Sequence, residues 1–135
     1  MTLVDAGPLI ALLDSDDPDH QRCMHALPAL EGPLVTTWPA FTEATYLLGD
    51  RAGWPAQERL WRLVLRDDLL LLPVDGPMLQ RARDLMRKYR DLPMDLADAT
   101  LVAVAESKRL RTVFTLDADF RVYRLPGSAA FEIVP

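Results

Sequence analysis

The chain begins Met1-Thr2-Leu3-Val4-Asp5-Ala6-Gly7-Pro8-Leu9-Ile10, and this stretch decides how the rest of the fold is interpreted. Its first apolar residues predict a buried strand that ends on a carboxylate, after which Gly7-Pro8 turns the chain into an apolar segment at residues 9–13. Open α/β sheets bind their ligands outside the carboxyl ends of the strands. Asp5 therefore stands where a ligand would bind, although an acid here can equally form a turn or cap the next helix.

Strand-like and helix-like segments alternate along the remaining sequence. We expect further strands at residues 34–37, 69–74, 112–115 and 131–134, and helices at residues 20–30, 39–48, 56–66, 78–90 and 94–110. Gly53-Trp54-Pro55 separates the second helix from the third. This alternation predicts an α/β protein with a mainly parallel sheet covered by helices on both faces. Without a repeat, a low-complexity tract or a linker, residues 1–135 are expected to form one domain.

Composition limits the classes of function. Half of the 135 residues are hydrophobic, which is enough for a real core, and the single cysteine, Cys23, excludes an intrachain disulfide and a multi-cysteine zinc site. A net charge of −5 argues against binding nucleic acid through global charge, but a nuclease with a carboxylate-rich metal site is compatible with it. No apolar stretch reaches the roughly 18 residues of a membrane helix, and no basic leader precedes one, so we expect a cytoplasmic protein.

Further acids occur at positions comparable with Asp5. Asp117 and Asp119 follow the strand expected at residues 112–115, so the fold should bring them to the same edge of the sheet. One of these two is expected to serve only as a turn former. Glu43 lies inside a helix, four residues after its proline start, where it can be either a site residue or an exposed helix acid.

Two aspartates at the front of the helix expected at residues 94–110 require an explanation, because that helix is apolar on nearly every side and should be buried. Asp95 follows Pro93 and can be a simple N-terminal cap. Asp98, one turn deeper and beside small apolar residues, favours a functional role. Carboxylates gathered in one pocket repel one another unless they bind protons or a cation, and a site of oxygen ligands alone suits Mg²⁺ or Mn²⁺.

These acids lie in four motifs that together resemble a PIN domain. More narrowly, they resemble the ribonuclease toxins of the VapC type from VapBC toxin–antitoxin modules. The motifs, in chain order, are Val4-Asp5-Ala6-Gly7-Pro8-Leu9, Thr42-Glu43-Ala44, Asp95-Leu96-Ala97-Asp98-Ala99-Thr100-Leu101 and Phe114-Thr115-Leu116-Asp117-Ala118-Asp119-Phe120. Each motif is short, but four in this order cover nearly the whole chain.

The resemblance implies a three-layer α/β/α sandwich around a mainly parallel sheet, and an endoribonuclease that depends on Mg²⁺ or Mn²⁺. The acidic core would consist of Asp5, Glu43, Asp98 and Asp117. In this scheme Asp5 and Asp98 hold the principal ion, and Glu43 and Asp117 complete its shell, partly through water. An ion held in this way can lower the pKa of a water molecule and stabilise charge on the phosphate oxygens.

Three accessory residues complete the expected site. They are Asp95, Asp119 and Thr115, whose hydroxyl is expected to hold one of the acids or a water of the metal shell. The chain departs from the resemblance at Gly7, because many relatives carry a Ser or Thr two residues after the first aspartate. A hydroxyl contact available to them is therefore missing here.

The expected partners are RNA, an antitoxin of the VapB type that covers the site and inserts an arginine among the acids, and a second copy in a homodimer. The basic helix at residues 78–90 offers Arg81, Arg87 and Lys88 as RNA contacts, although such a run can also be a solvated helix face. The sequence has a surplus of large apolar residues, which includes Trp38, Trp54, Trp61 and Met78. This surplus indicates an interaction surface, though core packing explains most of it.

Two alternatives remain open from the sequence. The chain could be a PIN-like binding module without catalytic activity. It could also be a phosphoacceptor domain of the response-regulator type, which likewise combines an α/β fold, clustered aspartates and Mg²⁺. The phosphoacceptor alternative lacks support because no lysine follows a late strand; Arg111 precedes its strand.

Overall fold

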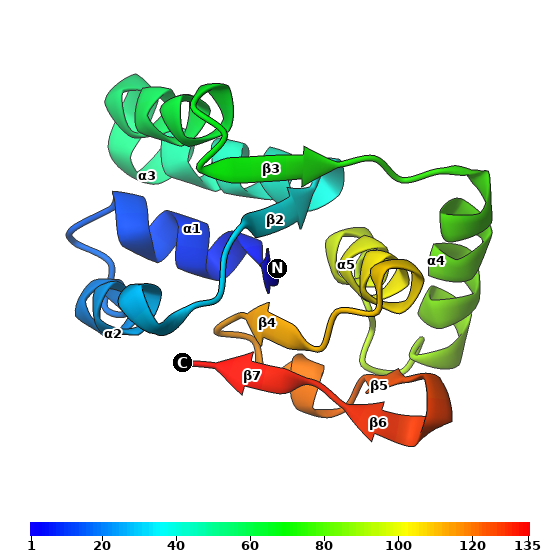
Figure 1. Ribbon diagram of the computed structural model, residues 1–135. Helices are drawn as coiled ribbons and strands as arrows, with labels where there is room; N and C mark the ends of the chain where they lie inside the picture. Colours follow the sequence, from blue (N-terminus) through cyan, green and yellow to red (C-terminus); the bar gives the residue numbers. More distant parts are fainter.

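The computed structural model describes all residues, 1–135, and has a five-stranded sheet at its centre (Figure 1). The strand order is β3-β2-β1-β4-β7, and each neighbouring pair is parallel. The strands are β1 (Thr2–Val4), β2 (Leu34–Thr37), β3 (Leu69–Leu72), β4 (Thr112–Phe114) and β7 (Glu132–Val134). The expectation of a mainly parallel sheet is confirmed.

Helices cover both faces of this sheet, as the three-layer sandwich requires. In Figure 1, α4 (Gly76–Lys88) and α5 (Leu96–Lys108) lie on one side, and α1 (Ala6–Leu13) and α2 (His20–Ala26) lie on the other. The long α3 (Trp38–Leu65) packs mainly against α1, and its N-terminal part also contacts α5. The α/β/α architecture is therefore confirmed.

The alternation of side chains along the central strands creates two separate cores. Leu3 and Val113 point into the cluster beneath α4 and α5, whereas their neighbours Val4 and Phe114 point into the cluster beneath α1 and α3. All four of these side chains are fully buried. A strand that is apolar on both faces, such as β1, is typical of a parallel sheet with helices on either side.

The topology reverses at β1, and this reversal creates the site. The chain proceeds from β1 outward to β2 and β3, then returns to add β4 on the opposite side of β1. At such a switch point the loops after the two central strands separate and leave a crevice. Asp5 follows β1 and Asp117 follows shortly after β4, so both acids lie at this crevice.

Several expected helix boundaries were wrong. The helix expected at residues 20–30 ends at Ala26 and gives way to a short 3₁₀ turn, Leu27–Ala29, because Pro28 has no N–H to continue the helix. The helix expected at residues 94–110 begins at Leu96 because Asp95 is its N-cap, and it ends where Arg109 adopts a left-handed conformation.

The break expected at Gly53-Trp54-Pro55 is present as a kink inside one long helix. Gly53 has φ 71° and ψ −171°, which is outside helical geometry, and Pro55 lies inside the helix just beyond it. Across the kink, the side-chain amide of Gln57 donates a hydrogen bond of 2.8 Å to the carbonyl of Thr45. The two parts of α3 are therefore joined by a polar contact.

Two elements were not expected from the sequence. The apolar segment after Asp5 is helix α1, and a small antiparallel hairpin, β5 (Arg124–Leu125) with β6 (Ala129–Ala130), precedes β7. The hairpin strands have only two residues each, which is too short to give a periodic pattern. No helix in the structure is both long enough and apolar enough to cross a bilayer.

Candidate metal centre

Three aspartates from distant parts of the chain meet at the crevice. One carboxylate oxygen from each of Asp5, Asp98 and Asp117 lies within 4.8 Å of the other two. Asp5 and Asp98 are buried, with 6% and 4% of their surface exposed, whereas Asp117 is exposed. A pocket of about 270 Å³ contains all three, and Glu43 and Asp95 also line it. The four acids of the expected core therefore share one pocket.

Asp5 is held by hydrogen bonds to both of its carboxylate oxygens. The backbone N–H of Ala6 donates to Oδ1 at 2.7 Å, so Asp5 caps helix α1, and the hydroxyl of Thr115 donates to Oδ2 at 2.8 Å. Thr115 Oγ1 in turn accepts a hydrogen bond of 3.0 Å from the backbone N–H of Asp117. Asp5 can therefore be both the N-cap of α1 and a metal ligand, because capping leaves its carboxylate in the pocket.

Asp98 is held from two directions. Its backbone N–H donates to Asp95 Oδ1 at 2.8 Å, so Asp95 is the N-cap of α5 as the simpler interpretation predicted. Its own Oδ2 accepts a hydrogen bond of 2.7 Å from the buried hydroxyl of Tyr123. Tyr123 was not among the expected site residues. It lies 25 residues from Asp98 in the sequence, and no local pattern connects the two.

Burial makes the ionised form of these acids costly. Desolvation raises the pKa of Asp98 from 3.8 to about 8, with a further contribution from the charge of Asp5. It raises the pKa of Asp5 to about 6, against the lowering effect of the hydrogen bonds from Thr115 and Ala6. The pKa of half-buried Glu43 is also raised, first by desolvation and then by Asp95 and Asp5. The pocket would therefore favour a cation that neutralises its acids.

The donor set fits a hard divalent cation. Every side chain in the cluster of three offers a carboxylate oxygen, and no histidine or cysteine belongs to it. Oxygen ligands alone suit Mg²⁺ and Mn²⁺, and both ions are commonly bound through a few carboxylates with water completing the shell. Asp5, Asp98 and Asp117 would be the ligands.

The remaining acids have different positions. Glu43 lines the pocket without belonging to the cluster of three. Asp119 is outside the cluster, and its backbone N–H donates to Asp117 Oδ1 at 2.9 Å. The structure thus groups Asp117, rather than Asp119, with the buried aspartates.

The basic residues of α4 differ in what they contact. Arg81 donates two hydrogen bonds, of 2.7 and 2.9 Å, to the carboxylate of Glu106 on α5. Glu106 is eight residues beyond Asp98, which is roughly 12 Å along the helix axis. The Arg81 guanidinium is therefore paired, and it is not among the residues that line the acidic pocket. Arg87 and Lys88 are exposed at the end of α4, and a short connection joins that end to the start of α5.

The large apolar residues divide into two groups. Trp38 and Trp54 are 52% and 61% exposed, as an interaction surface requires. Trp61 packs edge-on against Phe41 with ring centroids 5.0 Å apart, and Met78 is buried in the core under α4. Core packing, the other explanation given for the apolar surplus, therefore accounts for Met78 and for the partly buried Trp61.

Comparison with known proteins agrees with this arrangement of the sheet. The family model described as PIN domain matches residues 2–125, which is nearly the whole chain. The protein belongs to the PIN domain family. Among its curated relatives is the protein named Ribonuclease VapC26 from Mycobacterium tuberculosis, which is 28% identical over 134 residues, or 98% of this chain and 99% of the relative.

Solved PIN-domain structures share the fold. The crystal structure of VapC20 from Mycobacterium tuberculosis, described as a sarcin–ricin loop cleaving toxin, superposes with a TM-score of 0.86 at 20% identity over 100% of both chains. A toxin–antitoxin complex from Klebsiella pneumoniae gives a TM-score of 0.70 at 22% identity and covers 100% of this chain and 97% of its own. At these identities the likeness shows the PIN fold.

Proposed function

We propose that this protein is a divalent-cation-dependent endoribonuclease and the toxin of a toxin–antitoxin pair. The observation that carries the proposal is the meeting of Asp5, Asp98 and Asp117 within 4.8 Å at the switch point of a PIN-domain sheet. Membership of the PIN family and similarity to a protein named as a VapC ribonuclease support hydrolysis of RNA. Because RNA is the proposed substrate, we place the activity in the cytoplasm.

The acids would hold Mg²⁺ or Mn²⁺, with Asp5 and Asp98 as the principal ligands and Asp117 beside them. Such a cation lowers the pKa of water and neutralises charge on a phosphodiester. The protein's contribution is to hold the ligands still: Thr115 orients Asp5, and the N-cap at Asp95 anchors the backbone of Asp98. Glu43, at the same pocket, would complete the shell through water.

We further propose that the partners are an antitoxin and a second copy of the chain. A structural neighbour described as a toxin–antitoxin complex supports the antitoxin. Exposed Trp38 and Trp54 supply apolar surface for protein contacts. Of the basic residues on α4, we retain Arg87 and Lys88 as RNA contacts and leave out Arg81, because its guanidinium is bound to Glu106.

Cleavage of a single-stranded RNA pool tests the function. We expect wild-type protein to cut RNA with Mg²⁺ or Mn²⁺ and to stop when a chelator removes the ion. Asp5→Ala and Asp98→Asn should both lose cleavage. Asp50→Asn, which changes an exposed acid on α3, is the matched control and should cut like wild type. Wild-type rates in Asp98→Asn would refute the proposed site, and partner binding without any RNA cleavage by wild type would favour a binding module instead.

A further inference from the structure

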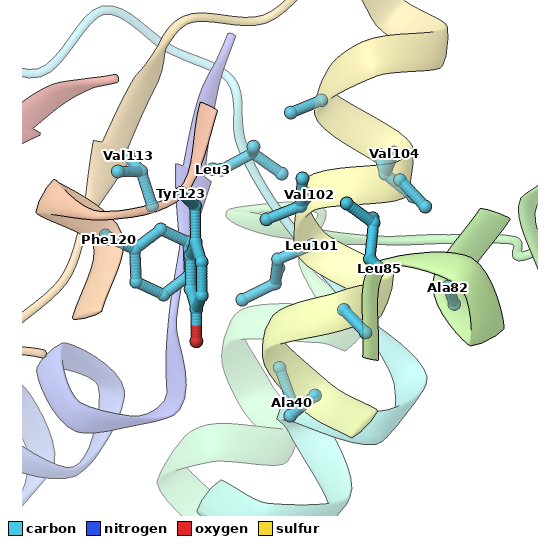
Figure 2. Packing of buried hydrophobic residues seen from close by; sticks show 14 of the residues in the cluster. Leu3, Ala40, Ala82, Leu85, Leu101, Val102, Val104, Val113, Phe120 and Tyr123 are labelled. Atoms are coloured by element: carbon cyan, nitrogen blue, oxygen red, sulfur yellow. The ribbon is translucent and has the colours of Figure 1, made fainter. Parts of the chain in front are cut away.

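Tyr123 reaches the acidic pocket from the apolar core beneath α5. The residue is fully buried and follows a short 3₁₀ turn, Ala118–Arg121, that comes after β4. Its hydroxyl donates a 2.7 Å hydrogen bond to Oδ2 of Asp98. Figure 2 shows the Tyr123 ring beside Phe120, with the hydroxyl oxygen extending away from the surrounding apolar side chains. The ring therefore belongs to the core and the hydroxyl to the site.

Two aromatic neighbours hold the Tyr123 ring in one orientation. Tyr89 and Phe120 pack edge-on against it, with ring centroids 5.1 and 5.0 Å from its own. Tyr89 is itself tied down, because its hydroxyl accepts a hydrogen bond of 3.1 Å from the backbone N–H of Arg124. A ring packed in this way has little freedom to turn, so the hydroxyl is presented to Asp98 at a constant position.

The choice of partner distinguishes this contact from an ordinary buried tyrosine. A buried tyrosine hydroxyl needs some hydrogen-bond partner, and backbone carbonyls are the usual acceptors. Here the acceptor is a buried carboxylate of the proposed cation site, on a different element. The same segment of chain after β4 supplies Thr115 to Asp5, so each buried aspartate receives one hydroxyl from it. Partners of this kind that orient metal ligands are known to alter metal affinity.

We propose that Tyr123 is a positioning residue that holds the Asp98 carboxylate in the orientation needed to share a cation with Asp5 and Asp117. The inference rests on the proposed cation site, and it adds that the Tyr123 hydroxyl sets how tightly this site binds the cation. Removal of the hydroxyl leaves the carboxylate able to turn away from the cluster. Cation binding weakens as a result, by about 10- to 100-fold, whereas cleavage at saturating cation falls much less.

The test measures Mn²⁺ binding to RNA-free protein by electron paramagnetic resonance of the free ion. Tyr123→Phe removes the hydroxyl and keeps the ring, and Tyr46→Phe is the matched control because Tyr46 is exposed and does not line the acidic pocket. We expect the Mn²⁺ dissociation constant of Tyr123→Phe to rise about 10- to 100-fold and that of Tyr46→Phe to stay within about twofold of wild type. In cleavage assays, Tyr123→Phe should need more Mn²⁺ for half-maximal rate and approach the wild-type rate at saturation. Wild-type Mn²⁺ affinity in Tyr123→Phe overturns the inference.

A second measurement uses the wild-type protein and does not depend on the folding of a variant. Titration with Mg²⁺ should shift the NMR signal of the Tyr123 ring carbon that bears the hydroxyl, and leave exposed Tyr46 unchanged. An unshifted Tyr123 signal at saturating Mg²⁺ contradicts the role. Failure of wild type to bind Mn²⁺ or cut RNA would refute the proposed function itself, whereas normal wild-type activity with an unaffected Tyr123→Phe would refute only this inference.

Discussion

The hydroxyl of Thr115 donates a 2.8 Å hydrogen bond to Oδ2 of Asp5, although 110 residues separate the two in sequence. The same hydroxyl oxygen accepts the backbone N–H of Asp117 at 3.0 Å. Thr115 therefore connects the acid that follows β1 to the loop that carries the acid after β4. Two of the three proposed cation ligands are positioned by one buried side chain.

Thr115→Val should reduce cation affinity or cleavage by about 10- to 100-fold, as is usual when a metal ligand is deprived of its hydrogen-bond partner. Valine keeps the volume of threonine but cannot donate to Asp5. Thr115→Ser retains the hydroxyl and should stay within a few-fold of wild type. Isothermal titration with Mn²⁺ and cleavage rates would compare the three proteins. Equal activity of the valine and serine variants would contradict a role for the hydroxyl.

The metal-free protein should lose the stabilising contribution of Asp5 and Asp98 as pH rises. Their pKa values in the folded protein are raised to about 6 and about 8 from 3.8, mainly by desolvation. Between the ordinary pKa of 3.8 and these raised values, the folded state binds more protons than the unfolded chain. The free energy of unfolding therefore falls as pH increases through this range. This contribution is fully present below about pH 4 and is lost as pH passes through the folded pKa values.

Mg²⁺ should therefore raise the melting temperature more at about pH 8 than at about pH 5, because the cation competes with protons for these carboxylates. Thermal unfolding with and without Mg²⁺ measures this difference. Asp98→Asn removes the acid with the larger pKa shift and should show a smaller difference between the two pH values. A larger Mg²⁺ effect at the lower pH in wild type would contradict the prediction.

Arg87 and Lys88 should contribute to RNA binding, and Arg81 should not. On single-stranded RNA, each phosphate that a basic side chain neutralises steepens the slope of log affinity against log salt concentration by roughly 0.7. Replacing both Arg87 and Lys88 with alanine should therefore make the slope shallower by roughly twice that value. Fluorescence anisotropy with the Asp98→Asn protein, which we expect to bind RNA without cutting it, measures the slope.

Arg81→Ala provides the matched control on the same helix. Removal of its ion pair with Glu106 should lower the free energy of unfolding by about 1 kcal/mol and leave the salt slope unchanged. If Arg81→Ala changed the slope of log affinity against log salt concentration as much as the double replacement of Arg87 and Lys88 does, Arg81 would again be assigned as an RNA contact.

Gly53→Ala should destabilise the protein by about 1–2 kcal/mol, because φ of 71° is unfavourable for any residue with a Cβ. Gly76→Ala is the matched control: an added Cβ there meets no atom within 4 Å, and the residue has ordinary φ. Chemical denaturation should show a change of no more than about 0.5 kcal/mol for the control. Equal stabilities of the two variants would contradict the proposed strain.

Much of the fold could be predicted because its signals are local. Apolar runs at β2 and β3, each followed by a helical pattern, together with further apolar runs at β1 and β4, were sufficient to predict a parallel sheet with helices on both faces. The order of the strands was not among the predictions, since it depends on which distant strands pair. The β5–β6 hairpin was missed because two-residue strands carry no pattern.

The sequence by itself determined which carboxylates were candidates. Asp5 and Asp117 follow strands, and Asp98 lies in an apolar helix where an acid has no ordinary structural role. Periodicity and the cost of burying charge are properties of a short segment, so both can be evaluated along the chain.

Only the tertiary structure decided what these residues contact. It grouped Asp117 rather than Asp119 with the buried aspartates, and it paired Arg81 with Glu106. It also brought the hydroxyl of Tyr123 to Asp98. The physical reason is that hydrogen bonds and ion pairs act over about 3 Å, whereas the residues that form them here are contributed by separate strands and helices. Their meeting depends on how the whole sheet is ordered and covered, which no single segment encodes.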